Sequence, residues 1–144
     1  MKSKDIIAKA HDWIGTKFKH QGRIKKTLND SGGCDCLGLI MGLDIKTKNN
    51  LSLNLYDQTN YPKFSTSNTL LDKLNLLLKS VTLDEIQPGN IILIRINNWP
   101  QHLAIVVDTN PEITIIHSYV QARKVVKQYL PKEWKCNIVA VYQV

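Results

Sequence analysis

Apolar and polar positions follow one period in the first half of the chain and another after residue 90. Residues 3–14 and 66–78 repeat apolar side chains at the spacing of an amphipathic helix, and Thr66 or Ser67 is the expected N-cap of the second. The apolar positions are Ile6, Ile7, Ala10 and Ile14 in the first segment and Leu70, Leu71, Leu74, Leu77 and Leu78 in the second. Two amphipathic helices are therefore predicted before residue 80.

A third, shorter helix is predicted from Asp35 to about Leu43. It directly follows a glycine-rich turn and reads "CLGLIMGL". Its two internal glycines lower the helix propensity, but they allow close packing against another backbone. The segments on either side of it, residues 16–34 and 46–65, are polar and lack a period. We expect both to be loops, the second a long excursion over the surface.

After residue 90 the pattern changes to short β-branched runs separated by turns. The runs span residues 91–96, 102–108, 113–119, 124–129 and 137–144. The sequence "DTNPE" (108–112) is typical of a tight hairpin connection. We therefore expect an α+β domain over residues 1–144, with N-terminal helices packed on a five-stranded antiparallel meander.

Composition and charge narrow the class of protein. The chain has 144 residues, 43% hydrophobic and 22% charged, which is typical of a folded globular domain. Its net charge of +7 favours an anionic partner such as nucleic acid, phospholipid or an acidic wall polymer. The densest basic cluster, residues 17–26, carries no nucleic-acid fold signature, so no nucleic-acid partner is expected. No apolar run approaches membrane-spanning length, so no membrane span is expected either.

The three cysteines indicate neither a disulfide scaffold nor an ordinary zinc site. Cys34 and Cys36 are too close in sequence to bond easily, and a C-x-C pair lacks the usual zinc spacing. The chain has no C-x-x-C motif. A metal site built from Cys34, Cys36 and a histidine stays open as an alternative. Cys136 is expected to be an ordinary buried thiol.

Cys36 stands where a nucleophilic cysteine would be expected. It falls at the first turn of the predicted helix, after Gly32 and Gly33. Unpaired N–H groups at a helix N-terminus favour a thiolate, and they can also receive an oxyanion. We therefore expect the pKa of Cys36 to lie below that of a free cysteine.

Two histidines could supply the base. His102 opens one apolar strand and His117 ends the next, so a hairpin turning near residues 109–111 brings them close together. One could take the thiol proton while the other holds its ring. Alternatively, each is a core histidine with a single hydrogen bond.

Five segments, in this order, resemble the NlpC family of papain-like cell-wall cysteine peptidases. They are "WIGTKFKHQG" (13–22), "CDCLGLIMG" (34–42), "IQPGNIILI" (86–94), "QHLAIVVD" (101–108) and "IIHSY" (115–119). The wording "GCDCLGL" is closest to the branch found in phage tails and gene-transfer agents. The resemblance covers nearly the whole chain and is weakest over residues 46–65.

The resemblance implies a role for each matching residue. Cys36 would be the nucleophile, His102 the general base and later acid, and His117 the residue that orients His102. Asp35 would grip a free amine of the substrate. The implied reaction is hydrolysis of a peptide bond in peptidoglycan stem peptides, typically between γ-D-glutamate and a diamino acid, through a thioester and without a cofactor.

The chain departs from the family pattern at two positions that we expect to contact the substrate. Leu37 replaces a serine that often follows the nucleophile, and Phe18 replaces a tyrosine whose hydroxyl can donate to the oxyanion. His20 or backbone N–H groups could take over that donation. Cys34 would be a neighbour lining the approach, so Cys34→Ser is expected to keep activity and Cys36→Ser to abolish it.

Four functions remain open from the sequence. The first is a wall-degrading peptidase carried in a phage-like tail, which would reach the wall from the cytoplasm without a cleaved leader. The second is a non-catalytic tail protein that binds other tail proteins through residues 46–65. The third is an amidase or acyltransferase on the same scaffold, and the fourth is a metal or redox protein.

Overall fold

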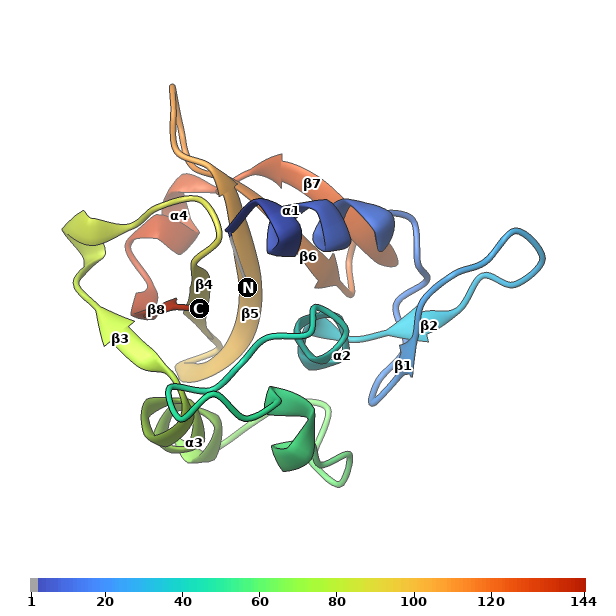
Figure 1. The fold of residues 1–144 in the computed structure, drawn as a ribbon, viewed down its shortest axis with the longest axis horizontal. Coiled ribbons are helices and arrows are strands. Elements are labelled where there is room, and N and C mark those ends of the chain that lie inside the picture. Colours follow the sequence, from blue (N-terminus) through green and yellow to red (C-terminus); the bar gives the residue numbers. More distant parts are fainter. Residues whose placement is uncertain (1–2) are drawn as a thin grey trace.

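The computed structural model describes residues 3–144; the first two residues of the basic N-terminal start lie outside this range. The helices are α1 (Ser3–Asp12), α2 (Cys36–Met41), η1 (Leu53–Tyr56), α3 (Thr69–Leu77), η2 (Leu83–Glu85) and α4 (Lys132–Lys135). The strands are β1 (Arg23–Ile24), β2 (Gly33–Cys34), β3 (Lys79–Val81), β4 (Ile91–Ile96), β5 (Trp99–Asp108), β6 (Thr114–Tyr119), β7 (Lys124–Tyr129) and β8 (Ile138–Gln143). The described chain is thus a mixed α and β structure, with most helices before the main strands (Figure 1).

The main sheet is antiparallel throughout, but it is not the predicted five-stranded meander. It has six strands in the order β3-β8-β4-β5-β6-β7. The last strand, β8, pairs with β4 and not with β7, with Ile92 opposite Val141. All four residues from Ile91 to Ile94 are fully buried, which favours a central place for β4 between two strands. The sixth strand, β3, has only three residues, too few for the sequence pattern to reveal.

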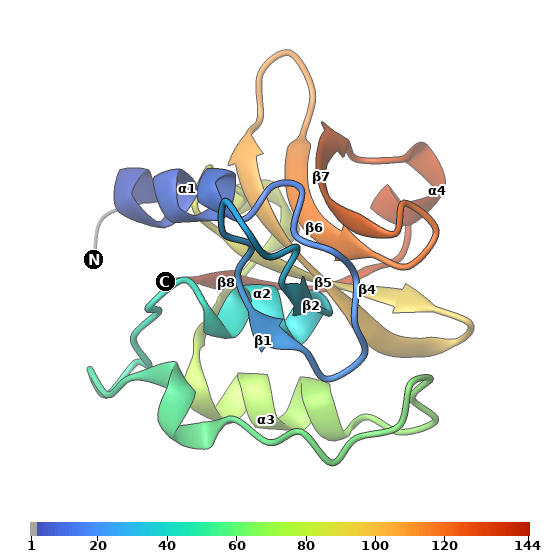
Figure 2. The same cartoon turned by 90° about the vertical axis from the view of Figure 1, so that its right-hand side faces the viewer.

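Apolar side chains form a cluster on each side of the sheet. The larger cluster joins side chains of α1, α2 and α3 to the sheet, including Ile6, Leu39, Leu74, Leu93 and Ile105. The smaller cluster lies on the opposite face, where Trp134 of α4 packs against it. Figure 2 shows α1, α2 and α3 one below another on the same side of the sheet. The sheet is therefore a rigid support for the side chains at its edges and ends.

The three predicted helices are present, with changes at their ends. α1 spans most of its predicted range, whereas α3 begins only at Thr69. Its N-cap position is held by Asn68, one residue after the predicted Ser67, but the Ser67 hydroxyl still accepts a hydrogen bond from the backbone N–H of Thr69 over 3.4 Å. α2 starts as predicted, with Asp35 as its N-cap, and ends at Met41.

A glycine in α2 allows the close packing expected from the sequence. A Cβ atom added to Gly38 would lie 2.0 Å from the backbone oxygen of Gly22. Any other residue at position 38 would push α2 away from the loop in front of it. The first turn of α2 is therefore fixed against that loop.

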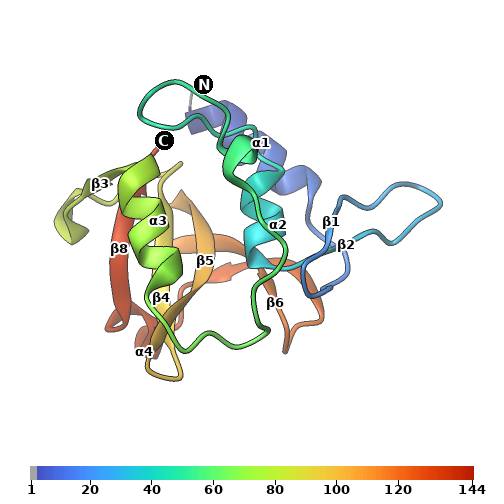
Figure 3. The ribbon, with the colours of Figure 1, turned by 90° about the horizontal axis from the view of Figure 1, so that it is seen from below.

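The two predicted loops are more ordered than their sequences indicate. Residues 16–34 contain the short pair β1–β2, and the loop that connects these two strands projects from the body in Figure 1. Residues 46–65 contain η1, whose Leu53 is fully buried. Figure 3 shows the chain after η1 running along α2 before it reaches α3. This part is more than a surface excursion, because several of its residues line the cavity described below.

Candidate active site

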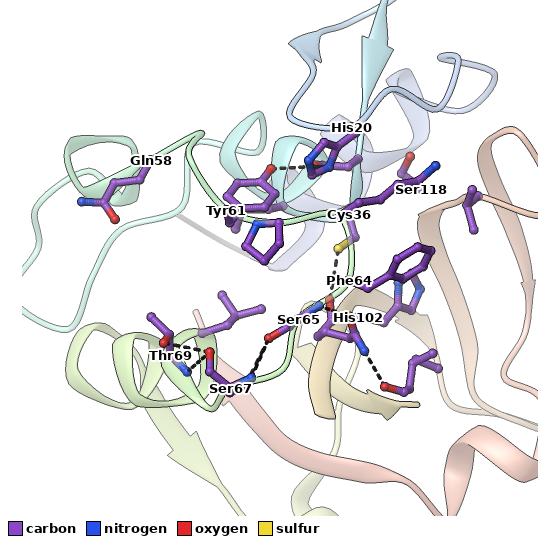
Figure 4. A pocket seen from close by; sticks show the side chains of 18 of the residues that line it. His20, Cys36, Gln58, Tyr61, Phe64, Ser65, Ser67, Thr69, His102 and Ser118 are labelled. Carbon is purple, nitrogen blue, oxygen red and sulfur yellow. Dashed lines mark hydrogen bonds and ion pairs between the residues drawn. The ribbon is translucent and has the colours of Figure 1, made fainter. Parts of the chain in front are cut away.

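Cys36 is the first residue of α2 and lies at a cavity of about 380 Å³. Its side chain is half-buried, and its thiol donates a hydrogen bond to the backbone carbonyl of Gln101 over 3.7 Å. Figure 4 shows the sulfur pointing into the cavity. The glycine-rich turn and the cap at Asp35 place the thiol there, as the sequence predicts.

His102 lines the same cavity and is held from behind by His117. The Nε2 atom of His102 lies 2.7 Å from Nδ1 of His117, and both side chains are buried. The sequence-based prediction that the hairpin brings them together is confirmed. The ladder that pairs Ile105 with Ile116 puts the two histidines diagonally across β5 and β6. Because Nε2 of His102 faces His117, Nδ1 is the ring nitrogen that remains available at the cavity.

Aromatic rings enclose the two histidines. The ring of Trp134 packs against His102 at 5.1 Å and His117 at 5.4 Å between centroids, and Tyr119 stacks on His117 at 5.2 Å. This enclosure removes water, and burial lowers the pKa of His102 to about 3, with His117 as a second cause. Burial also lowers the pKa of His117. Both imidazoles are therefore neutral near pH 7.

The thiol of Cys36 is neutral as well. Burial, followed by the nearby Asp35 carboxylate, raises its pKa from 9.0 to about 12. The sequence-based expectation of a lowered pKa for Cys36 is therefore wrong. The short helix α2 does not offset the loss of water around the sulfur. The resting site is thus a neutral thiol and a neutral imidazole at one cavity, and the thiol needs a base in order to react.

The buried His102 has a consequence for stability at acid pH. Its pKa is 6.5 as an ordinary histidine and about 3 in the folded chain, so between these values only the unfolded state binds the proton. Above about pH 6.5 His102 is neutral in both states and does not reduce the unfolding free energy. Below that pH the unfolded state takes up the proton, so the unfolding free energy falls as the pH decreases. We expect urea unfolding to show a steeper loss of stability from neutral pH to about pH 4 in the wild type than in His102→Gln. Equal slopes in the two proteins would contradict a buried neutral His102.

Asp35 joins α2 to two other segments of the chain, around residues 21–23 and around Tyr61. Its Oδ1 atom accepts hydrogen bonds from the backbone N–H of Gly38 at 2.8 Å and from Arg23 at 3.2 Å. Its Oδ2 atom accepts from the backbone N–H of Gln21 at 2.8 Å and from the Tyr61 hydroxyl at 2.5 Å. Four donors saturate the carboxylate in this conformation. A substrate amine at Asp35 would have to displace one of them.

Residues 57–67, which we call the strap, run along the cavity and supply part of its lining. Tyr61 ties the strap to Asp35, and the backbone N–H of Ser65 donates to the side chain of Gln101 at 2.7 Å. Arg23 holds the start of the strap through two hydrogen bonds to Asp57, at 2.9 and 3.0 Å. The sequence did not reveal the strap, because these residues have no period and their partners are far away in the chain. Their content of tyrosine, glutamine and asparagine was the only signal.

Removing the Tyr61 hydroxyl is expected to loosen this strap. Tyr61→Phe deletes the hydrogen bond to the Asp35 carboxylate but keeps the ring. A hydrogen bond to a charged group contributes about 1.5–3 kcal/mol, so we expect a loss of about that size in the unfolding free energy. Hydrogen exchange at residues 57–67 should speed up more than exchange in β4. Unchanged exchange in the strap would show that Tyr61 does not hold it.

The remaining predicted contact residues also reach the cavity. Its lining includes Phe18, His20, Asp35, Cys36, Leu37 and His102, together with the strap and part of α3. Nδ1 of His20 lies 3.9 Å from Asp35, and its ring meets the edge of Tyr61. Phe18 carries no hydroxyl, so it cannot donate to an oxyanion, whereas His20 also lines the cavity. The structure thus brings six of the seven predicted residues around one cavity, with His117 behind.

The other two cysteines differ from their predicted places. Cys34 is fully buried in the core and does not line the approach. Burial raises its pKa to about 11, which makes it unreactive. Cys136 is exposed and not buried, because α4 ends there at the surface. Within residues 3–144, no group of three histidine, cysteine, aspartate or glutamate side chains could hold a metal ion.

The described residues also lack a membrane-spanning element. None of the helices between residues 3 and 144 has both the length and the apolar character needed to cross a bilayer.

Comparison with known proteins identifies the fold. The P60 domain of antigen MAP1204 from M. avium subspecies paratuberculosis is similar with a TM-score of 0.60 and 16% identity, over 98% of this chain and 92% of that one. The NlpC/p60 domain of the peptidoglycan hydrolase SagA matches with a TM-score of 0.61 and 15% identity over 100% of both chains. An NlpC/P60 family protein from Bacillus cereus ATCC 10987 matches with a TM-score of 0.65 and 15% identity, over 99% of this chain and 40% of that one.

Comparisons of the sequence with family models and with curated proteins found no match. At 15–16% identity, the three structures establish the fold. The chain therefore has an NlpC/P60 fold, with Cys36 and His102 at one cavity and His117 behind His102.

Proposed function

We propose that this protein is a cysteine peptidase that hydrolyses peptide bonds in peptidoglycan stem peptides. The observation that carries the proposal is the assembly of Cys36, at the start of α2, in one cavity with His102, whose far ring nitrogen is held by His117. A nucleophile, a base and an orienting group are the parts that acyl transfer requires. The NlpC/P60 fold, shared with the peptidoglycan hydrolase SagA, supports the choice of substrate.

The neutral resting state favours proton transfer during the attack. The Cys36 sulfur attacks the substrate carbonyl while Nδ1 of His102 takes the thiol proton, so that no free thiolate has to exist beforehand. The imidazolium of His102 then gives this proton to the leaving amine, which leaves a thioester on Cys36. Water, activated by the same imidazole, hydrolyses the thioester and frees the thiol.

The cavity suits an anionic peptide. Lys63 and Lys73 belong to its lining, whereas its one carboxylate, Asp35, is already paired with Arg23. Stem peptides carry free carboxylates that these lysines can attract. Asp35 can grip a free substrate amine, as proposed from the sequence, only if Tyr61 gives up its hydrogen bond. We further propose the bond between γ-D-glutamate and a diamino acid as the one cleaved, on the sequence resemblance.

Digestion of purified peptidoglycan tests the proposal. The wild type is expected to release fragments with new amino and carboxyl ends within the stem peptide, detected by liquid chromatography and mass spectrometry. Cys36→Ala should release none. Intact stem peptides after prolonged incubation with the wild type would refute the proposal.

A non-catalytic structural role is the second candidate, and one observation favours it. Burial of Cys36, with the nearby Asp35 carboxylate, disfavours the thiolate and raises the pKa of this thiol to about 12. A structural protein would leave stem peptides intact even after prolonged incubation. An amidase or acyltransferase would instead form a new amide when amines are added to the digestion.

A phage-like tail is the proposed setting. Its support is the sequence "GCDCLGL", which resembles the branch found in phage tails and gene-transfer agents. In that setting a particle would carry the enzyme to the cell wall. Co-purification of the protein with assembled tails, from cells in which the particles are induced, tests this part separately.

A further inference from the structure

We propose that Gln128 on β7 is a positioning residue that fixes the tautomers of both histidines. The inference rests on the proposed function for its purpose, but it concerns the resting protein and can be tested without any substrate. Oε1 of Gln128 lies 2.9 Å from Nε2 of His117. Hydrogen bonds therefore connect Gln128 to His117 and His117 to His102, which lines the cavity.

The backbone fixes which way the Gln128 amide faces. Its Nε2 group donates a hydrogen bond to the carbonyl oxygen of Tyr129 over 3.4 Å. A carbonyl oxygen can only accept, so the nitrogen of the amide belongs on this side and the oxygen faces His117. The amide oxygen in turn can only accept. Nε2 of His117 must therefore carry the proton.

The tautomer of His117 in turn fixes the tautomer of His102. Because both imidazoles are neutral, each carries one proton. With its proton on Nε2, His117 presents an unprotonated Nδ1, which accepts from Nε2–H of His102 at 2.7 Å. His102 then has no proton on Nδ1, the nitrogen left for the cavity. This tautomer is the one that can take the proton of Cys36.

The opposite amide orientation would disable the base. An N–H of Gln128 pointing at His117 would require an unprotonated Nε2 there and a proton on its Nδ1. His102 would then accept at Nε2 and carry its proton on Nδ1, facing the thiol with a donor. A wrong histidine tautomer is costly in another triad enzyme, where it reduces kcat about 10⁴-fold.

Nitrogen NMR of the resting protein, labelled with ¹⁵N-histidine, tests the inference directly. In the wild type, we expect Nε2 to be protonated and Nδ1 to be unprotonated in both His102 and His117. In Gln128→Leu we expect a mixture of tautomers for both rings. In Gln128→Glu the carboxylate can still accept from His117, so the wild-type tautomers should persist.

Kinetics with a stem peptide provide a second readout. We expect Gln128→Leu to lower kcat about tenfold with KM unchanged, because the fraction of competent His102 falls. Gln128→Glu should retain most of the rate. Gln143→Leu, the same substitution at an exposed residue of β8, is the matched control and should behave as the wild type.

Two results would overturn the assignment. One is a wild-type His102 protonated at Nδ1, and the other is identical tautomers in the wild type and in Gln128→Leu. Neither depends on hydrolysis, so the inference and the proposed function fail separately. The expected tautomers with no cleavage of any stem peptide would support the assignment and count against the proposed function alone.

Discussion

Cys36→Ala is expected to abolish stem-peptide cleavage, with a loss in kcat of about 10⁴-fold or more. Cys36 is the only one of the three cysteines that lies at the cavity, at the first turn of α2. Alanine keeps the helix but removes the atom that would form the thioester. The loss should appear in kcat, because the nucleophile acts in the chemical step. Initial rates of product formation with a defined stem peptide measure this effect.

Two control variants make this result specific. Cys34→Ala removes a fully buried thiol without placing a polar group in the core, and Cys136→Ser changes an exposed one. Both proteins should cleave at rates within a few-fold of the wild type. A Cys36→Ala protein with wild-type activity would exclude Cys36 as the nucleophile.

His102→Gln is expected to reduce kcat about 10³-fold or more, the second-largest effect. The raised pKa of Cys36, about 12, leaves almost no thiolate near neutral pH, so the base is required for the attack. Glutamine can still hydrogen-bond to His117, but it cannot take a proton. The residual rate of the variant should rise with pH as hydroxide replaces the base. A pH series of initial rates for both proteins measures this.

A histidine away from the cavity serves as the control for this substitution. His11 is exposed on α1 and bonds only to the backbone of that helix and to Lys127. His11→Gln should leave the rate unchanged at every pH. If His102→Gln retains wild-type activity, then His102 is not the base, and the neutral pair at the cavity is a structural feature.

Local structure was predictable from the sequence, whereas the sheet topology was not. The helices of α1 and α3 and the strands of β4 to β7 follow from apolar periods that involve only neighbouring residues. The position of β8 in the sheet depends on whether β8 pairs with β7 or with β4, whose residues Ile91 to Ile94 are buried. That choice is made by packing on both faces of the sheet, which no single period encodes.

The residues of the site also fall into those that the sequence predicted and those that it did not. Cys36, His102 and His117 could be found, because a helix start and a hairpin bring them together by local geometry. Tyr61 and Gln128 could not, because their partners, Asp35 and His117, become neighbours only after the whole chain folds. The sign of the Cys36 pKa shift was missed for the same reason. The burial of the thiol and its closeness to the Asp35 carboxylate arise only in the folded chain.

Trapping the acyl-enzyme tests the central claim most directly. A stem-peptide donor activated as an aryl ester acylates the enzyme quickly, so the slower hydrolysis lets the thioester accumulate. Intact mass and peptide mapping after an acid quench should find the donor acyl group on Cys36 in the wild type and not in His102→Gln. An acyl group found only on the exposed Cys136, or none while the ester is consumed, would contradict the account.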